Sequence, residues 1–109
     1  MNWINITSSE QLEEIKEKSQ TVPQVIFKHS TRCSISNMAK NRLERSEQPL
    51  NIDFYYLDLI KYRNLSSKLA EDFDVWHESP QILVIKNQRC IYDESHSAIS
   101  MEDILEQAV

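Results

Sequence analysis

None of the 109 residues of this chain is glycine. Glycine is the residue that most easily adopts the positive φ angles that many tight turns require. Turns in this chain must therefore use asparagine at such positions or keep to type I geometry. The same absence excludes every motif that depends on a glycine-rich phosphate loop.

The length and composition predict one ordinary globular domain over residues 1–109. Apolar residues make up 40% of the chain and charged residues 27%, as in most soluble domains. A chain of this length buries a core without disulfide staples. Its apolar runs, such as residues 82–85, are far too short to span a bilayer, and no apolar signal segment opens the chain. We therefore expect a cytoplasmic protein.

The charge and the cysteine count narrow the function further. The net charge is −5 and no basic cluster is present, which argues against nucleic acid as a partner. The two cysteines, Cys33 and Cys90, are expected to be free thiols in a reducing cytosol. No Cys/His spacing fits a zinc site, so we expect no metal and no bound cofactor.

The first half of the chain alternates between strand and helix patterns. Residues 3–6 resemble a short strand, and Ser8 with Gln11 forms a capping box that opens a helix running to about Ser19. Residues 25–27 are an apolar run typical of a strand buried on both faces. Residues 28–33 are expected to be the loop that follows it. A second helix and a strand at 52–57 come next, and the predicted inward positions of the two helices are Leu12, Ile15, Ile35, Met38, Ala39 and Leu43.

The second half predicts a helix, a hairpin and a last helix. Residues 81–86 are of strand type, Asn87-Gln88 is the turn, and residues 89–92 pair back, with Cys90 and Tyr92 expected on one face. Ser100 is the expected cap of the last helix. The inward positions of the two helices are Tyr62, Leu65, Leu69, Phe73, Met101, Ile104, Leu105 and Ala108. The order βα-βαβα-ββα predicts an α/β fold with a central mixed β-sheet flanked by helices.

Cys33 is the strongest candidate for chemistry, because it stands where a buried strand gives way to a helix. Free N–H groups and the helix dipole favour an anion at a helix start. This position, together with the neighbouring Arg32, favours the thiolate, which is the nucleophile of disulfide exchange. Ser36 occupies the position where a dithiol enzyme carries its second cysteine. Its hydroxyl can hydrogen-bond the thiolate but cannot form a disulfide.

A second feature lies 47 residues later, at Pro80. The Ser79-Pro80 step enters a predicted strand and is compatible with a cis bond in a tight turn. Trp76 and His77 precede it and are candidates to flank the thiol and its adduct. We take Ser79, Pro80, Trp76 and His77 as a substrate-positioning segment.

Three other residues have simpler interpretations. His29 either tunes Cys33 or is a surface histidine. His96 stands in a turn, where a structural hydrogen bond is expected. Cys90 is expected to be a small core residue of the last strand rather than a redox group.

Three segments resemble the monothiol bacilliredoxins, the YtxJ-like branch of the thioredoxin superfamily. The segment from Lys28 to Ser36 resembles the family's active-site segment, although Ser34 stands where the family commonly has proline. The segment His77-Glu78-Ser79-Pro80-Gln81 resembles its cis-proline loop. Ser95-His96 followed by Ile99-Ser100 resembles its C-terminal signature. The resemblance covers nearly the whole chain and implies a thioredoxin-like fold.

The resemblance also implies a function. Family members are thought to act on mixed disulfides between proteins and bacillithiol, a small thiol of Gram-positive bacteria that serves as co-substrate. Cys33 would attack the bacillithiol sulfur and free the client protein, and a second thiol or another redoxin would restore Cys33. The alternative from another class is a non-catalytic adaptor or thiol carrier with an unreactive Cys33. Membership of the monothiol glutaredoxins is disfavoured, because those proteins carry Cys-Gly-Phe-Ser and a later Gly-Gly pair, whereas this chain has no glycine.

Overall fold

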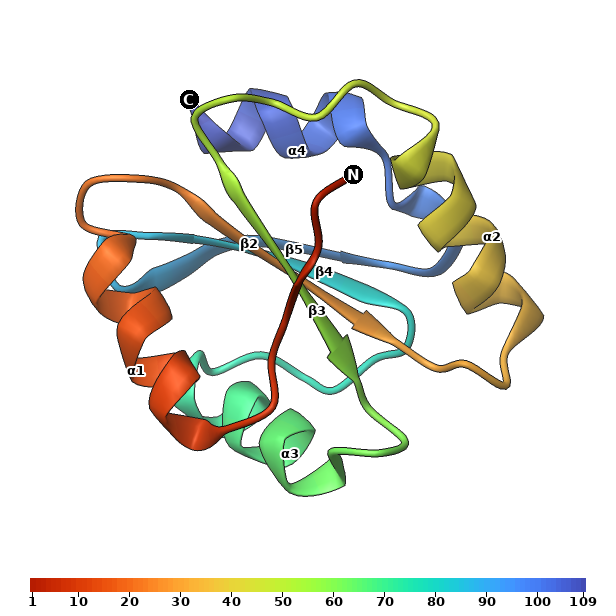
Figure 1. Cartoon of the computed structure of the whole chain (residues 1–109), viewed down its shortest axis with the longest axis horizontal. Helices are drawn as coiled ribbons and strands as arrows, with labels where there is room; N and C mark the ends of the chain where they lie inside the picture. Colours follow the sequence, from red (N-terminus) through yellow and green to blue (C-terminus); the bar gives the residue numbers. More distant parts are fainter.

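The centre of the molecule is a five-stranded β-sheet with the strand order β1-β3-β2-β4-β5 (Figure 1). The computed structural model describes all residues from 1 to 109. The element order is the predicted one, and the mixed α/β architecture is confirmed. The elements are β1 (Ile4–Asn5), α1 (Ser9–Lys18), β2 (Gln24–His29), α2 (Ser34–Glu44), β3 (Asp53–Asp58), α3 (Arg63–Asp72), β4 (Gln81–Lys86), β5 (Arg89–Ser95), η1 (His96–Ala98) and α4 (Met101–Ala108).

Strand β2 lies in the middle of the sheet and all six of its residues are buried. It runs parallel to β3 and antiparallel to β4, and β1 lies parallel to β3 on the far side. The carboxyl ends of β1, β2 and β3 therefore meet at one edge of the sheet. The loop that carries Cys33 leaves the sheet at this edge.

Two apolar cores lie on the two faces of the sheet. Alternate residues of a strand point to opposite faces, so Val25 and Phe27 pack under α2 and α4, whereas Ile26 packs under α1 and α3. Figure 1 shows the same division, with α2 and α4 on one side of the sheet and α1 and α3 on the other. No helix combines the length and the apolar character that a membrane span requires.

The buried faces of α2 and α4 differ from prediction at three positions. In α2 the buried stripe is Ser36, Ala39 and Leu43, which are spaced three and four residues apart. Ile35 and Met38 each precede a residue of that stripe and lie outside it on the helix surface. These two residues are 49% and 61% exposed. Leu105 of α4 is also exposed, at 37%. Their predicted inward placement is wrong, because the face that meets the sheet is narrower than the apolar pattern.

The glycine-free turns use other residues at positive φ. Asn87 and Gln88 have φ values of 51° and 68°, as a two-residue type I′ hairpin turn requires. Asparagine at such a position was expected, but glutamine there costs roughly 1 kcal/mol. The turn is held by the buried Ser19, whose carbonyl accepts from the Asn87 N–H at 2.9 Å and whose hydroxyl accepts from the Gln88 N–H at 2.8 Å. Asp74 and His96 also have positive φ.

A β-bulge in β5 separates Cys90 from Tyr92. Val84 lies opposite Tyr92, but the next residue of β4, Ile85, lies opposite Cys90, so Ile91 is an extra residue. Cys90 consequently packs with the core under α1 and α3, and Tyr92 with the core under α2 and α4. The expectation that both side chains share one face is wrong, because it assumed an unbroken alternation.

Candidate active site

Cys33 is the N-cap residue of α2, as its position in the sequence predicts. Its backbone is extended, with φ −108° and ψ 122°, and helical geometry begins at Ser34. The Cys33 N–H donates to the Ser30 carbonyl at 3.2 Å, and the Cys33 carbonyl accepts from the Asn37 N–H at 3.0 Å. The side chain is a free, partly exposed thiol. It therefore sits at the positive end of the helix dipole with access to solvent.

Ser36 does not play the role that the sequence suggested for it. Its hydroxyl oxygen lies 2.6 Å from His29 Nδ1 and accepts from the Ser30 N–H at 3.0 Å. A bond from Ser36 to the Cys33 thiol was expected and is not among the hydrogen bonds of the structure. Ser36 instead fastens the first turn of α2 to the end of β2, because both of its partners precede Cys33 in the chain.

His29 is part of the strand and is buried, so it is neither a loop residue nor a surface histidine. Its ring stacks on Phe27 with centroids 5.6 Å apart, and its centroid lies 5.4 Å from that of the Tyr56 ring. Burial, and then the charge of Lys40, lower the pKa of His29 below its ordinary value. The imidazole is therefore neutral at pH 7 and serves as a hydrogen-bonding partner of Ser36.

Lys28 was also expected in the loop, but it is a fully buried residue of β2. Its Nζ donates to Gln81 Oε1 at 3.0 Å and lies 2.8 Å from His77 Nδ1. Burial lowers the pKa of Lys28 to about 8, against the opposing charge of Glu78. Lys28 thus holds His77, in the loop before β4, from inside the sheet.

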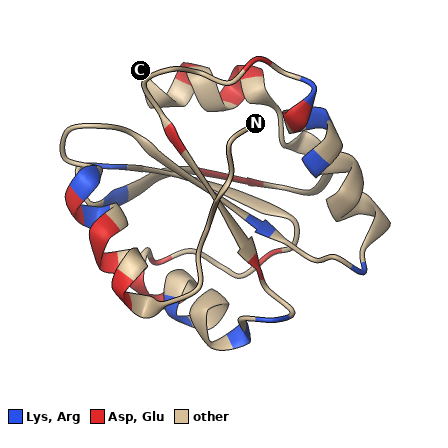
Figure 2. Ribbon diagram, viewed as in Figure 1, with Lys and Arg blue, Asp and Glu red and all other residues tan.

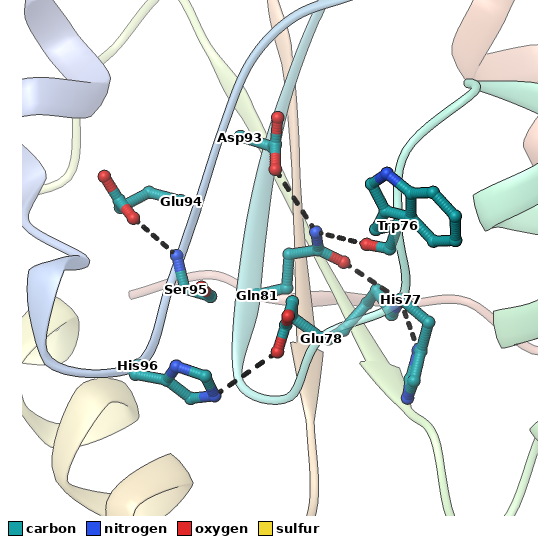
Figure 3. Close-up of polar contacts among 9 residues, drawn as sticks. Trp76, His77, Glu78, Gln81, Asp93, Glu94, Ser95 and His96 are labelled. Atoms are coloured by element: carbon teal, nitrogen blue, oxygen red, sulfur yellow. Dashed lines mark hydrogen bonds and ion pairs between the residues drawn. The ribbon is translucent and has the colours of Figure 1, made fainter.

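Gln81 connects this amine to the loop and to β5 (Figure 3). Its Nε2 donates to the Trp76 carbonyl at 3.0 Å and to Asp93 Oδ2 at 3.4 Å. Burial, and then the charge of Lys28, lower the pKa of His77. Sequence reasoning missed Lys28 and Gln81. The available signal was a lysine directly after an apolar strand and a glutamine directly after the loop proline.

The loop proline lies at the same sheet edge as Cys33. The Ser79–Pro80 peptide bond is cis. Gln81 is in register opposite Lys28, so Pro80 falls beyond it toward the end of β2 from which the Cys33 loop departs. The Pro80 carbonyl accepts from the His96 N–H at 3.1 Å, which agrees with the structural hydrogen bond expected for His96. Ser79 Oγ is buried without a partner.

Two of the predicted site residues project into solvent. Trp76 is 89% exposed to solvent. An aromatic residue with a purely structural role in a loop is expected to be about half-buried. Arg32 is exposed beside Cys33 and makes no hydrogen bond or ion pair in the structure. Exposed Ile35 and Met38 lie on α2, which begins after Cys33. The thiol is therefore followed by an exposed apolar stretch of helix.

Cys90 lies at the opposite end of the sheet. It is opposite Ile85, which is itself opposite Gln24, the first residue of β2. Cys33 follows the last residue of β2, so five steps of about 3.3 Å place the two cysteines more than about 16 Å apart along the sheet. A disulfide requires Cα atoms within about 7 Å. No disulfide between the two can form in this fold.

The sheet, the four helices and the cysteine at the start of α2 define a protein of the thioredoxin fold. Solved structures show the same fold: thioredoxin from Malassezia sympodialis superposes with a TM-score of 0.78 at 19% identity, covering 99% of this chain and 92% of that one. Thioredoxin from Nicotiana alata superposes with a TM-score of 0.73 at 20% identity, covering 97% of this chain and 92% of that one. At these identities the likeness concerns the fold alone.

Two further comparisons are more specific. A solved protein described as a candidate oxidoreductase with a thioredoxin fold is 30% identical, with a TM-score of 0.82 over 96% of this chain and 91% of that one. The family model of the monothiol bacilliredoxin BrxC matches residues 4–104. The chain belongs to the monothiol bacilliredoxin family, as the resemblance of its three segments indicated.

Proposed function

We propose that this redoxin is a thiol-disulfide oxidoreductase that reduces mixed disulfides between proteins and bacillithiol. The observation that carries the proposal is the placement of a single reachable cysteine. Cys33 is partly exposed at a helix start, Ser36 stands at the second-cysteine position, and Cys90 lies at the far end of the sheet. Family membership supports the choice of bacillithiol as the small thiol.

The proposed first step is one disulfide exchange. The Cys33 thiolate attacks the bacillithiol sulfur of the mixed disulfide, so a new S–S bond joins Cys33 to bacillithiol while the bond to the client breaks. The client sulfur leaves as a thiolate and takes a proton from solvent. No net oxidation occurs, because one disulfide replaces another. No bound cofactor is needed.

The second step requires a thiol from outside the protein. A second bacillithiol thiolate, or a thiol of another redoxin, attacks the bacillithiol sulfur of the adduct and releases Cys33 as thiolate. The attacking thiol is oxidised to a disulfide. Ser36 cannot replace it, since a hydroxyl forms no disulfide. We place this cycle in the cytoplasm, where external thiols are kept reduced.

The segment from Trp76 to Pro80 is proposed to position the substrate. Lys28 and Gln81 hold its backbone and His77 from inside the sheet, while Trp76 stays exposed. A rigid loop with an exposed aromatic side chain suits an extended client segment that must present one sulfur to Cys33. Arg32, which has no partner, adds positive charge that favours the thiolate.

The test is incubation of the protein with a bacillithiolated client, followed by mass analysis of both. We expect the client to lose the mass of bacillithiol and Cys33 to gain it. A client that keeps its bacillithiol would refute the proposed activity and leave the adaptor function. A Cys33 that gains bacillithiol without freeing client thiol would indicate a passive thiol carrier.

A further inference from the structure

A small pocket lies on the α3 side of the sheet, next to the loop that contains the cis-proline. Its volume is about 240 Å³ and its lining residues are Leu59, Arg63, Ser66, Ser67 and His77. Leu59 follows β3, the first turns of α3 supply the arginine and both serines, and His77 comes from the loop before β4. The loop after β3, the start of α3 and the loop before β4, all within residues 59–77, thus meet at one site.

The lining of this pocket consists almost entirely of hydrogen-bond donors and contains no carboxylate. Arg63 carries a guanidinium that makes no ion pair or hydrogen bond with the rest of the protein. Ser66 is 4% exposed, and its hydroxyl has no partner. In a chain of net charge −5, such a set is unusual. Figure 2 shows the acidic residues gathered along α1, whereas the start of α3 is basic. An anion would satisfy these groups.

His77 contributes a donor whose direction is fixed by Lys28. With a pKa of about 8, Lys28 is an ammonium at pH 7 and can only donate hydrogen bonds, so His77 Nδ1, 2.8 Å from Nζ, must accept. The neutral ring therefore carries its proton on Nε2. In Figure 3 this second nitrogen of His77 points away from the polar network. The carboxylate of the following residue, Glu78, is turned to the other side, with Oε2 3.5 Å from His96 Nε2.

The pocket adjoins the end of β2 from which the Cys33 loop departs. The Leu59 N–H donates to the carbonyl of His29, the last residue of β2, at 3.1 Å. His77 Nδ1 is hydrogen-bonded to the amine of Lys28, the residue before His29. The pocket and the loop that carries Cys33 therefore lie at the same end of β2. The buried amine of Lys28, which has no carboxylate partner, adds positive charge behind it.

We propose that this pocket binds a carboxylate of the small thiol that becomes disulfide-bonded to Cys33. Arg63 and the hydroxyl of Ser66 are its main donors, and His77 Nε2–H is a third. The site would select thiols that carry an acidic group over neutral thiols of the same size. This inference rests on the proposed function, because it concerns the adduct formed in the first step.

The experiment compares two synthetic disulfides that differ only in charge. They are the 2-pyridyl disulfides of 3-mercaptopropionate and of its amide. Cys33 attacks the aliphatic sulfur, an S–S bond to the acid or amide forms, and pyridine-2-thione leaves with the electron pair of the broken bond. Release of the thione, measured in single turnovers, gives one rate for the carboxylate and one for the amide.

The wild type is expected to favour the carboxylate over the amide, and Arg63→Gln to reduce that preference about three- to tenfold. Ser66→Ala should reduce it about two- to threefold. Arg89→Gln is the matched control, because it removes an arginine at the far end of the sheet and should leave the preference unchanged. Circular dichroism of each variant checks the fold.

The outcomes separate this inference from the proposed function. If Cys33 forms no adduct with either disulfide, the proposed function fails. If both adducts form but Arg63→Gln keeps the wild-type preference, the function stands and the pocket is not the carboxylate site. If the preference for the carboxylate is lost in Arg32→Gln but kept in the pocket variants, it comes from the charge beside Cys33. That result would overturn the inference.

Discussion

The two cysteines of this protein stand in opposite situations, although both are partly exposed free thiols. Cys33 lies at the start of α2, where backbone N–H groups lack helical partners and the dipole favours negative charge. Cys90 lies in β5 beside a bulge and donates to the Tyr92 carbonyl at 3.3 Å. Burial raises the pKa of the Cys90 thiol to about 11.

The difference teaches that exposure alone does not make a reactive thiol. Cys90 touches solvent, yet its surroundings favour the protonated form, which is a poor nucleophile. Cys33 has a local environment that favours charge and a position beside the loop of Trp76 and His77. The fold thus places Cys33 at a helix start and Cys90 within a strand.

The largest effect is expected from removing each thiol in turn. Cys33→Ser should reduce the transfer of bacillithiol from a client to the uncatalysed rate, because the only nucleophile at the site is lost. Cys90→Ser should keep most of the activity, since its sulfur lies at the far end of the sheet. Initial rates of client release by mass spectrometry measure both. Equal losses would mean that both cysteines take part in the reaction.

Alkylation should separate the thiols by orders of magnitude. With a pKa of about 11, Cys90 is thiolate in only about one molecule in 10⁴ at pH 7. Iodoacetamide should therefore label Cys33 first, and labelling of Cys90 should rise about tenfold per pH unit up to that pKa. Peptide mapping after timed quenching gives both rates. Comparable labelling of the two at pH 7 would contradict the assigned roles.

Introducing a second thiol at the site should change how the adduct is resolved. Ser36→Cys places a thiol three residues after Cys33 on the helix, within disulfide reach. We expect it to release bound bacillithiol without external thiol, at least about a hundredfold faster than the wild type. Ser36→Ala is the control, because it also loses the hydrogen bonds to His29 and Ser30 but supplies no thiol. If Ser36→Ala released bacillithiol as fast as Ser36→Cys, the introduced thiol would not be the resolving group.

The last prediction concerns stability at alkaline pH, away from the reaction itself. Lys28 is protonated up to about pH 8 when folded and to 10.5 when unfolded, so the unfolded state binds more protons between these values. Lys28 therefore makes wild-type stability rise with pH over this range, by about 3 kcal/mol. The free energy of unfolding of the wild type, relative to that of Lys28→Met, should rise by that amount from pH 8 to 10.5.

Urea unfolding of both proteins at several pH values measures this change. Taking the difference cancels other titrations, such as that of Cys90, whose raised pKa makes stability fall with pH over part of the same range. A difference between the two proteins that stays constant with pH would mean that Lys28 is not the buried charge described here.

Much of the fold followed from local patterns in the sequence. The apolar runs at β2 and β4, the helix that begins after Cys33 and the proline before Gln81 all lie where the sequence placed them. These features depend on neighbouring residues, and hydrophobic periodicity reports such features well. The position of Cys33 at the start of a helix was therefore predictable from the sequence alone.

The polar network was not predictable in the same way. Lys28 and His29 look like loop residues because the apolar run ends at Phe27, yet both are buried. Their burial depends on partners elsewhere: His77 and Gln81 are about fifty residues from Lys28. The bulge in β5 likewise depends on pairing with β4. Such features arise from tertiary contacts that no local pattern records.

One cysteine carries the proposed reaction and an outside thiol completes it. The most direct measurement of this claim is the lifetime of the Cys33–bacillithiol adduct, prepared on the wild type, freed of small thiols and followed by intact mass spectrometry. We expect the adduct to persist without added thiol and to decay at a rate proportional to the concentration of bacillithiol added. Rapid loss of the adduct with no added thiol would contradict the one-cysteine mechanism.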